Sequence, residues 1–126
     1  MDVKIGGVLI HSEDPKALRD WYAKAFRATP DEQGEIGEDG FAIQAGDDQY
    51  FLFFSHDQVS GSAKEPARVI VNMQVDDAGA VASQLDSLGA RWIRPFEDGG
   101  PGRIGTVADP DGNYVQLLQT IEGAHA

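Results

Sequence analysis

Apolar and polar positions follow first a strand period and then a helix period, and this order occurs twice along the chain. A strand pattern within residues 3–14 precedes apolar positions at helical spacing, at Leu18, Trp21, Tyr22 and Phe26. Asp14 is expected to cap this helix, with Pro15 at its first position. Three further strands are predicted at about 28–36, 40–46 and 49–55.

The second half repeats this pattern. Asp14 aligns with Asp77 at an offset of 63 residues (77 − 14), which is half of the chain. Asp76 or Asp77 is expected to cap a second helix that ends at Gly89, and strands are predicted at about 91–95, 103–108 and 113–119. The repeat predicts an α+β fold made of two βαβββ modules in a single domain, 1–126. Module 1 is expected at about 1–56, a linker at about 57–66, module 2 at about 67–120 and a tail at 121–126.

The most specific motif lies near the end of the chain. Asp109-Pro110-Asp111-Gly112-Asn113 is a tight-turn signal, and an alternating strand containing Gln116 follows it. This hairpin resembles the last one of the glyoxalase/bleomycin-resistance/extradiol-dioxygenase group, the vicinal oxygen chelate superfamily. The resemblance covers the whole chain and implies cupped mixed sheets and a homodimer with clefts built from modules of both chains.

The resemblance also locates the positions where metal-using members hold their ligands. At the offset of 63 these positions are Gly7, Phe53, Ile70 and Gln116. The first three side chains have no donor atom, and an amide is a weak ligand for a divalent cation. We therefore expect neither a metal nor a cofactor.

Alternation predicts which side chains face the cup. One set is uniformly apolar and is expected to face the helices: Val8, Ile10, Leu52, Phe54, Val71, Met73, Val75, Val115 and Leu117. The opposite face mixes aromatic, amide and imidazole groups, and its predicted ligand-binding residues are His11, Phe51, Phe53, Asn72, Gln74, Tyr114 and Gln116. For His11 the alternative is a strand-end histidine in contact with water, and each of the amides can instead satisfy a neighbouring group.

Three further candidates come from the second half. Trp92 and Arg94 alternate on one face of a predicted edge strand, where they can form a stacking platform for a planar ligand or simply pack. Arg103 follows a glycine-rich segment at residues 99–102, which is either a flap or a plain connector.

Charge and composition restrict the classes of binding partner that we expect. Ten Lys and Arg against 21 Asp and Glu give a net charge of −11, which disfavours nucleic acid and anionic membranes. The charge favours a cationic ligand, or it serves only solubility. The chain contains no cysteine, which excludes disulfides and fits a cytoplasmic protein. No apolar run is long enough to span a membrane, and the first residues do not resemble a secretion signal.

Two functions follow. The first is a metal-independent small-molecule binding protein of the bleomycin-resistance type, which sequesters a cationic or aromatic antibiotic or metabolite. The second is an enzyme of the same fold, a lyase or isomerase acting on a small oxygenated metabolite. A ligand-responsive accessory protein is a third possibility that the sequence does not distinguish from these.

Overall fold

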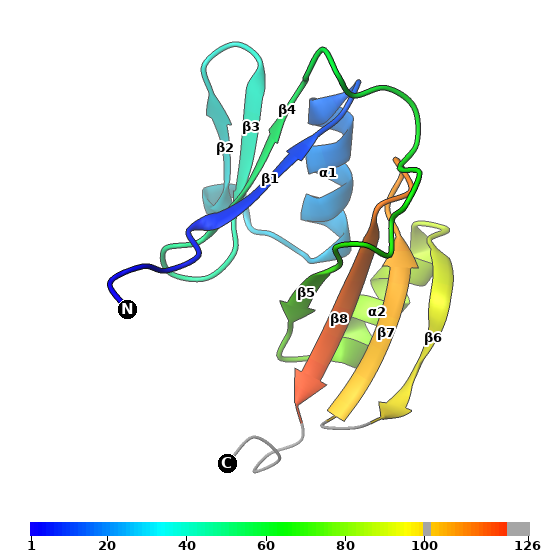
Figure 1. Cartoon of the computed structure of the whole chain (residues 1–126). Helices are drawn as coiled ribbons and strands as arrows, with labels where there is room; N and C mark the ends of the chain where they lie inside the picture. The colour runs from blue at the N-terminus through cyan, green and yellow to red at the C-terminus, as the bar shows by residue number, and fades with distance from the viewer. Residues whose placement is uncertain (100–101, 121–126) are drawn as a thin grey trace. The chain divides into compact units, whose positions relative to one another are not determined.

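Both halves of the chain fold as one strand, one helix and three strands (Figure 1). The computed structural model describes residues 1–99 and 102–120. The first half contains β1 (Gly7–His11), α1 (Pro15–Ala25), a short 3-10 helix (Pro30–Glu32), β2 (Gln33–Ile36), β3 (Gly40–Gln44) and β4 (Tyr50–Phe54). The second half contains β5 (Val71–Gln74), α2 (Ala78–Ser87), β6 (Arg91–Gly99), β7 (Gly102–Ala108) and β8 (Tyr114–Thr120).

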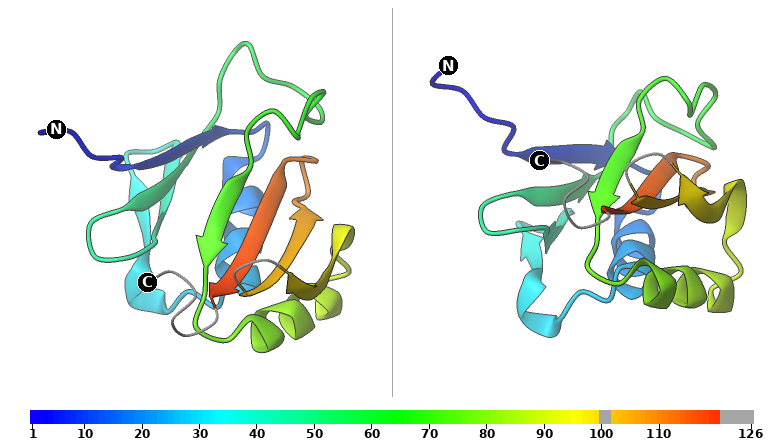
Figure 2. Two further views of the ribbon diagram at one scale, coloured as in Figure 1. Left: turned by 60° about the horizontal axis from the view of Figure 1, so that its bottom comes forward. Right: turned by 90° about the horizontal axis from the view of Figure 1, so that it is seen from below.

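Each half forms its own four-stranded mixed sheet. The strand orders are β1-β4-β3-β2 and β5-β8-β7-β6, with the first two strands of each parallel and the others antiparallel. The chain divides into two compact units, Met1–Gly61 and Ser62–Ala126. Within each unit the helix runs along one face of the sheet (Figure 2). The predicted α+β fold of two βαβββ modules is confirmed.

Both helices begin at the predicted aspartates. The carboxylate of Asp14 accepts a hydrogen bond from the backbone N–H of Ala17 at 3.1 Å, and Asp77 caps Ala80 at the same distance. These bonds satisfy N–H groups that have no partner inside a helix. Gly89 follows α2 with φ of +71°, a conformation that favours glycine.

Aromatic rings form the core of the first unit. Phe53 has no exposed surface, Phe51 is 3% exposed, and both face α1. The ring of Tyr22 lies 5.3 Å from that of Phe51 and 5.6 Å from that of Phe53, measured between centroids. The two phenylalanines of β4 therefore hold α1 on the sheet.

Aliphatic side chains form the core of the second unit: Val81 and Leu85 of α2 with Val107, Val115 and Leu117 of the sheet. The predicted turn joins β7 to β8. The Asp109 carboxylate accepts hydrogen bonds from the backbone N–H groups of Asp111 and Asn113, each at 2.9 Å, and Gly112 takes φ of +82°. This turn fixes the register of β8.

Some predicted bounds differ from the structure. Residues 28–32 are not part of a strand, because the Thr29 backbone and the Glu32 side chain instead cap the 3-10 helix that starts at Pro30. Strand β6 runs to Gly99, four residues beyond the predicted end. The predicted tail at 121–126 lies outside the described residues. In the described part of the chain, every helix falls short of the length and apolar character needed to cross a membrane.

Candidate functional site

Five of the ten predicted ligand-binding side chains lie on one face of the second sheet: Asn72, Gln74, Arg94, Tyr114 and Gln116. We call the face of a sheet opposite its helix the helix-free face. Directly paired residues on neighbouring strands share a face, so the register defines rows across this one, and three of them contain the predicted residues. The outer rows are Tyr114, Ala108 and Arg91 on one side and Gln74, Leu118, Ile104 and Glu97 on the other. The middle row is Asn72, Gln116, Thr106 and Arg94.

The middle row is polar in all four strands. The Nε2 of Gln116 donates a hydrogen bond to the Oδ1 of Asn72 at 3.0 Å, so the two amides hold one another in place. Thr106 follows on β7, and Arg94 ends the row on β6. Adjacent strands lie about 4.8 Å apart, so the row spans about 14 Å, the length of a molecule with several fused rings.

A β-bulge places Arg94 in this row. Trp92 pairs with Val107 and Arg94 with Thr106, so two steps along β6 match one step along β7. The bulge turns Arg94 to the helix-free face, while Trp92 faces α2 and its indole N–H donates to Asp86 at 2.8 Å. The prediction that Trp92 and Arg94 share a face was therefore wrong, because simple alternation does not survive a bulge.

Arg103 lies away from the middle row. It pairs with Asp98 on β6, and its guanidinium lies 4.6 Å from the ring centroid of Phe96. The Arg103 Nε is 3.5 Å from the carboxylate of Asp98. Together with Trp92, whose ring is 6.2 Å from that of Phe96, this cluster belongs to the α2 side of the sheet. The structure thus separates Trp92 and Arg103 from Arg94, Asn72, Gln74, Tyr114 and Gln116.

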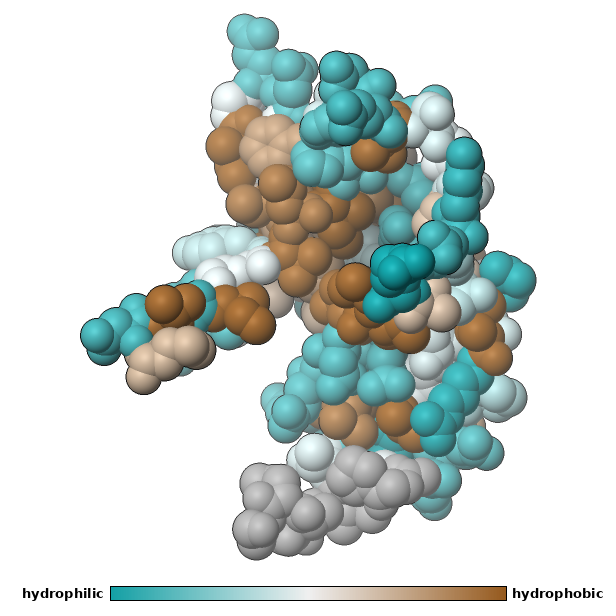
Figure 3. Space-filling model, in the orientation of Figure 1, coloured by the Kyte–Doolittle hydropathy of each residue, from teal (hydrophilic) through white to brown (hydrophobic). Residues whose placement is uncertain are grey.

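The first sheet differs from the second in the chemistry of its helix-free face. Leu9 is 53% exposed and Tyr50 43%, and the register adds Leu52 and Phe54 to the same face. The space-filling view shows hydrophobic surface gathered over this sheet (Figure 3). This face is apolar where the corresponding face of the second sheet is polar.

The predicted faces of β4 were wrong. Phe51 and Phe53 pack against α1, and Leu52 and Phe54 lie on the helix-free face. The cause is a change of repeat offset. Leu9 and Asn72 correspond at 63 residues, whereas their partners Leu52 and Gln116 correspond at 64 (116 − 52), so one residue is gained between α2 and the later strands. The counterpart of Gln116 is therefore Leu52 and not Phe53.

His11 lies on the helix-free face, as predicted, at the end of β1 beside Phe54. Its ring contacts that of His56 edge to face, with centroids 4.8 Å apart. The His56 Nδ1 accepts a hydrogen bond from the backbone N–H of Gln58 at 3.0 Å and lies 3.2 Å from the Asp57 carboxylate. His11 is thus part of a histidine pair that sequence alternation did not reveal.

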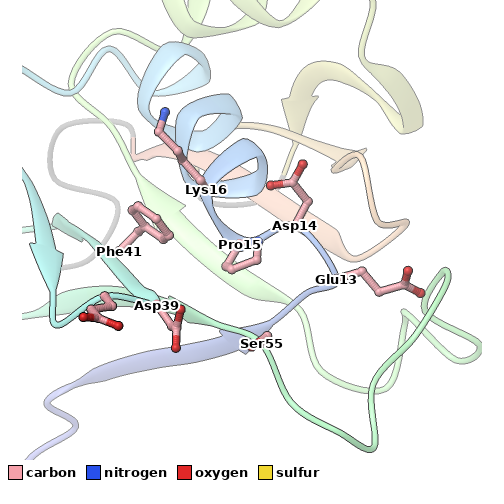
Figure 4. Close-up of a pocket in the computed structure, with 8 residues that line it drawn as sticks. Glu13, Asp14, Pro15, Lys16, Asp39, Phe41 and Ser55 are labelled. Atoms are coloured by element: carbon pink, nitrogen blue, oxygen red, sulfur yellow. The ribbon is translucent and has the colours of Figure 1, made fainter.

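The first unit also contains an acid-lined cavity of about 290 Å³ at the start of α1 (Figure 4). Carboxylates of Glu13 and Asp14 come from the β1–α1 loop, and those of Glu38 and Asp39 come from the β2–β3 turn. Lys16 is the one cation of its lining, and the ring of Phe41 forms part of its wall. This charge favours positively charged groups near the cavity.

The donor set does not fit the metal of metal-using relatives. With the offset corrected, the four ligand positions hold Gly7, Leu52, Ile70 and Gln116, and only the amide of Gln116 has a donor atom. That amide is already hydrogen-bonded to Asn72. Within residues 1–99 and 102–120 we find no group of three or more His, Cys, Asp or Glu side chains arranged to bind a metal ion.

The paired βαβββ modules define a glyoxalase-type fold, and the family comparison agrees. A family model described as a glyoxalase-like domain matches residues 7–118, and the chain belongs to this family. No curated protein matches the chain significantly.

Solved structures share the fold at low sequence identity. TnmS3, an antibiotic binding protein from Streptomyces sp. CB03234, is 19% identical with a TM-score of 0.70, over 96% of this chain and 99% of its own. A glyoxalase/bleomycin resistance protein/dioxygenase family enzyme from Burkholderia phytofirmans PsJN is 17% identical with a TM-score of 0.71, over 94% and 100%. A lactoylglutathione lyase from Agrobacterium tumefaciens is 15% identical with a TM-score of 0.67, over 99% and 96%.

Proposed function

We propose that the chain is a metal-independent small-molecule binding protein whose ligand lies on the helix-free face of the second sheet. The observation that carries this proposal is the hydrogen-bonded pair of Asn72 and Gln116 at 3.0 Å. The pair lies between the apolar side chains of Ala108, Ile104 and Leu118 and the polar or charged side chains of the outer rows. Polar groups held in a fixed orientation are what determine the orientation and specificity of a bound small molecule.

The donor set supports binding without a metal. A divalent cation needs several oxygen, nitrogen or thiolate ligands, and the positions that carry them in metal-using relatives offer one amide. The Nε2 of that amide donates to Asn72, which orients Gln116 toward hydrogen bonding with a neutral or charged organic group.

The ligand we propose is an aromatic or otherwise planar antibiotic or metabolite. The middle row spans about 14 Å, which matches a molecule of several fused rings. An antibiotic binding protein has the same fold, and we extend its type of ligand to this chain as part of the proposal. We also propose that the chain acts as a homodimer, which size-exclusion chromatography with light scattering tests directly.

An enzyme of the same fold, a lyase or isomerase acting on a small oxygenated metabolite, is the second candidate. The observation that favours it is that Arg94 and Gln116 lie in one row of the same face, since hydrogen-bond donors of this kind can polarise a carbonyl oxygen. The distinction between the two candidates is turnover of the bound molecule.

The test is calorimetry on the chelator-treated protein with bleomycin and a panel of planar aromatic antibiotics, followed by chromatography of the recovered ligand. We expect stoichiometric binding that is unchanged by EDTA, and recovery of intact ligand. Gln116→Ala is expected to weaken binding about tenfold or more, because it leaves Asn72 without its partner. Gln49→Ala, at an exposed loop position, is the matched control. Chemical conversion of the ligand, or binding only after metal is added, contradicts the proposal.

A further inference from the structure

The charge of the helix-free face of the second sheet differs in sign from that of the whole chain. Among the described residues of this face the formal charges are those of Arg91, Arg94 and Glu97, a balance of +1. The whole chain carries −11. At physiological salt the screening length is about 8 Å, so charges on the face weigh more for a bound ligand than acids elsewhere.

Arg94 is available to a ligand. It is exposed, and its guanidinium forms no ion pair or hydrogen bond with another residue of the described part of the chain. By contrast, Arg19, Arg68 and Arg103 each contact a carboxylate. A guanidinium offers five N–H donors in a planar fork that matches a carboxylate.

The other members of the middle row add hydrogen-bond donors beside the guanidinium of Arg94. The Oδ1 of Asn72 accepts from Gln116, so the Asn72 amide group still has both N–H donors free for a ligand. The Gln116 Nε2 keeps its second N–H, whereas Thr106, at 5% exposure, is buried between its neighbours in the row. The row thus runs from amide donors at β5 to a cationic donor at β6.

The bulge in β6 is what brings Arg94 to this face. Without the register shift between Trp92 and Arg94, the guanidinium would face α2 together with the indole. Bulges are frequent beside functional sites because they redirect a side chain at the cost of local pairing. A second register shift lies between Arg94 and Glu97, after which β6 and β7 pair regularly from Glu97 to Gly99.

We propose that Arg94 binds an anionic oxygen of a planar ligand, a carboxylate or an ionised hydroxyl, and determines specificity for that anion. Gln116 and Asn72 then donate hydrogen bonds to polar groups further along the same ligand. This inference rests on the proposed function, since it names the ligand class of the same face. It replaces the cationic ligand that net charge alone favours, because the local charges oppose a cation there.

The experiment compares three probes of one shape: 2-naphthoate, 2-naphthamide and 2-naphthylmethylammonium. Calorimetry gives each Kd, and amide chemical shifts of the labelled full chain locate each probe. We expect 2-naphthoate to bind about tenfold more tightly than the amide, since hydrogen bonds between charged partners are stronger than neutral ones, and the cation to bind most weakly. The largest shift changes should fall on the middle row.

Variants test whether the charge of Arg94 on this face, and not the net charge of the protein, determines the preference. Arg94→Gln should weaken 2-naphthoate binding about tenfold and 2-naphthamide binding much less, and so remove the preference for 2-naphthoate. Arg94→Lys keeps the charge without the planar fork and should retain part of the preference. Arg68→Gln removes the same charge from an exposed loop of the same unit and is expected to change nothing.

The possible results test the anion specificity separately from the proposed binding function on which it rests. Equal affinity for the three probes, or preference for the cation, with shift changes still on the middle row, overturns the anion specificity and leaves the binding function standing. Shift changes confined to other residues, or no binding of any probe at millimolar concentration, overturn both.

Discussion

Replacing the aromatic rings of β4 one at a time tests which face of this strand packs on α1. Phe53 is fully buried and lies within ring contact of Tyr22 and Phe51. Phe54, one residue on, lies on the opposite face over Gly40 and is only half-buried. Simple alternation along the sequence predicts that Phe54 is the buried residue and Phe53 the exposed one. The two packings of β4 therefore predict opposite rankings of the two substitutions by loss of stability.

The expected magnitudes follow from burial. Phe53→Ala removes a whole buried ring and leaves a cavity, which costs about 3–5 kcal/mol of unfolding free energy. Phe54→Ala removes about half as much surface from contact and should cost about 1–2 kcal/mol. A small domain has only about 5–15 kcal/mol in total, so Phe53→Ala can leave the unit unfolded. Phe53→Leu and Phe54→Leu then give the same ranking at smaller cost.

The assay uses the distribution of tryptophan. The chain has two, Trp21 in the first unit and Trp92 in the second. In a Trp92→Phe background, fluorescence during urea unfolding reports the first unit alone, and the m-value shows whether the transition is two-state. Equal destabilisation by the two alanine variants, or a larger effect of Phe54→Ala, would refute the packing of β4 described here.

Three further predictions concern caps, packing and pH. Asp77→Ala removes the α2 cap and should cost about 1 kcal/mol in the urea unfolding of the second unit, with Asp76→Ala as the neighbouring control. Gly105→Ala places a methyl group 2.7 Å from the Trp92 ring and should lower stability by about 1–3 kcal/mol, visible in thermal unfolding followed at that tryptophan. Burial alone would raise the pKa of Asp20, but hydrogen bonds from Lys16 and Arg19 outweigh it and hold the pKa below 3.8. The carboxylate therefore stabilises the first unit above pH 3.8 and less as pH falls through the lower native pKa, so the stability difference from Asp20→Asn, below about 1 kcal/mol, should vanish in acid.

The sequence pattern predicts the fold because its strongest signals are local. Asp14, Asp77 and Gly89 mark helix ends by hydrogen bonds and φ values that depend on a few neighbouring residues. The turn from Asp109 to Asn113 is likewise closed by its own side chains. The duplication then predicts the number and order of the remaining strands.

Alternation along the sequence assigns residues to the wrong face of a strand where one extra residue shifts all later positions by one. A gain of one residue between α2 and the later strands moves the counterpart of Gln116 from Phe53 to Leu52. Both phases of β4 are apolar, so the sequence Tyr50–Phe54 has no polar residue that would show which face packs. The bulge at Arg94 has the same effect within one strand. Its local signal is Pro95, because a proline has no N–H for the strand ladder and within sheets occurs at edges and bulges.

The assignment of strand residues to faces also determines how much of the site can be predicted from the sequence. Asn72, Gln74, Tyr114 and Gln116 were placed together correctly because the apolar residues between them, Val71, Met73, Val115 and Leu117, fix the phase of β5 and β8. Thr106 was missed because β7 is buried on both faces, so that its face is defined only by pairing with Gln116 on β8. Whether these side chains contact a ligand stays a prediction.

The two modules have diverged on the faces that the helices leave free. A residue that packs against a helix is constrained by volume in both copies, whereas the helix-free positions tolerate any side chain compatible with a strand. In the first copy Leu9 and Leu52 occupy adjacent strands, and in the second the corresponding residues are Asn72 and Gln116. Amides at these positions cost little in strand stability and gain a mutual hydrogen bond, so the change from an apolar to a polar row needs only a few substitutions. The guanidinium of Arg94 requires in addition a bulge, which weakens the pairing of β6, and this cost is consistent with a role for Arg94 beyond holding the sheet together.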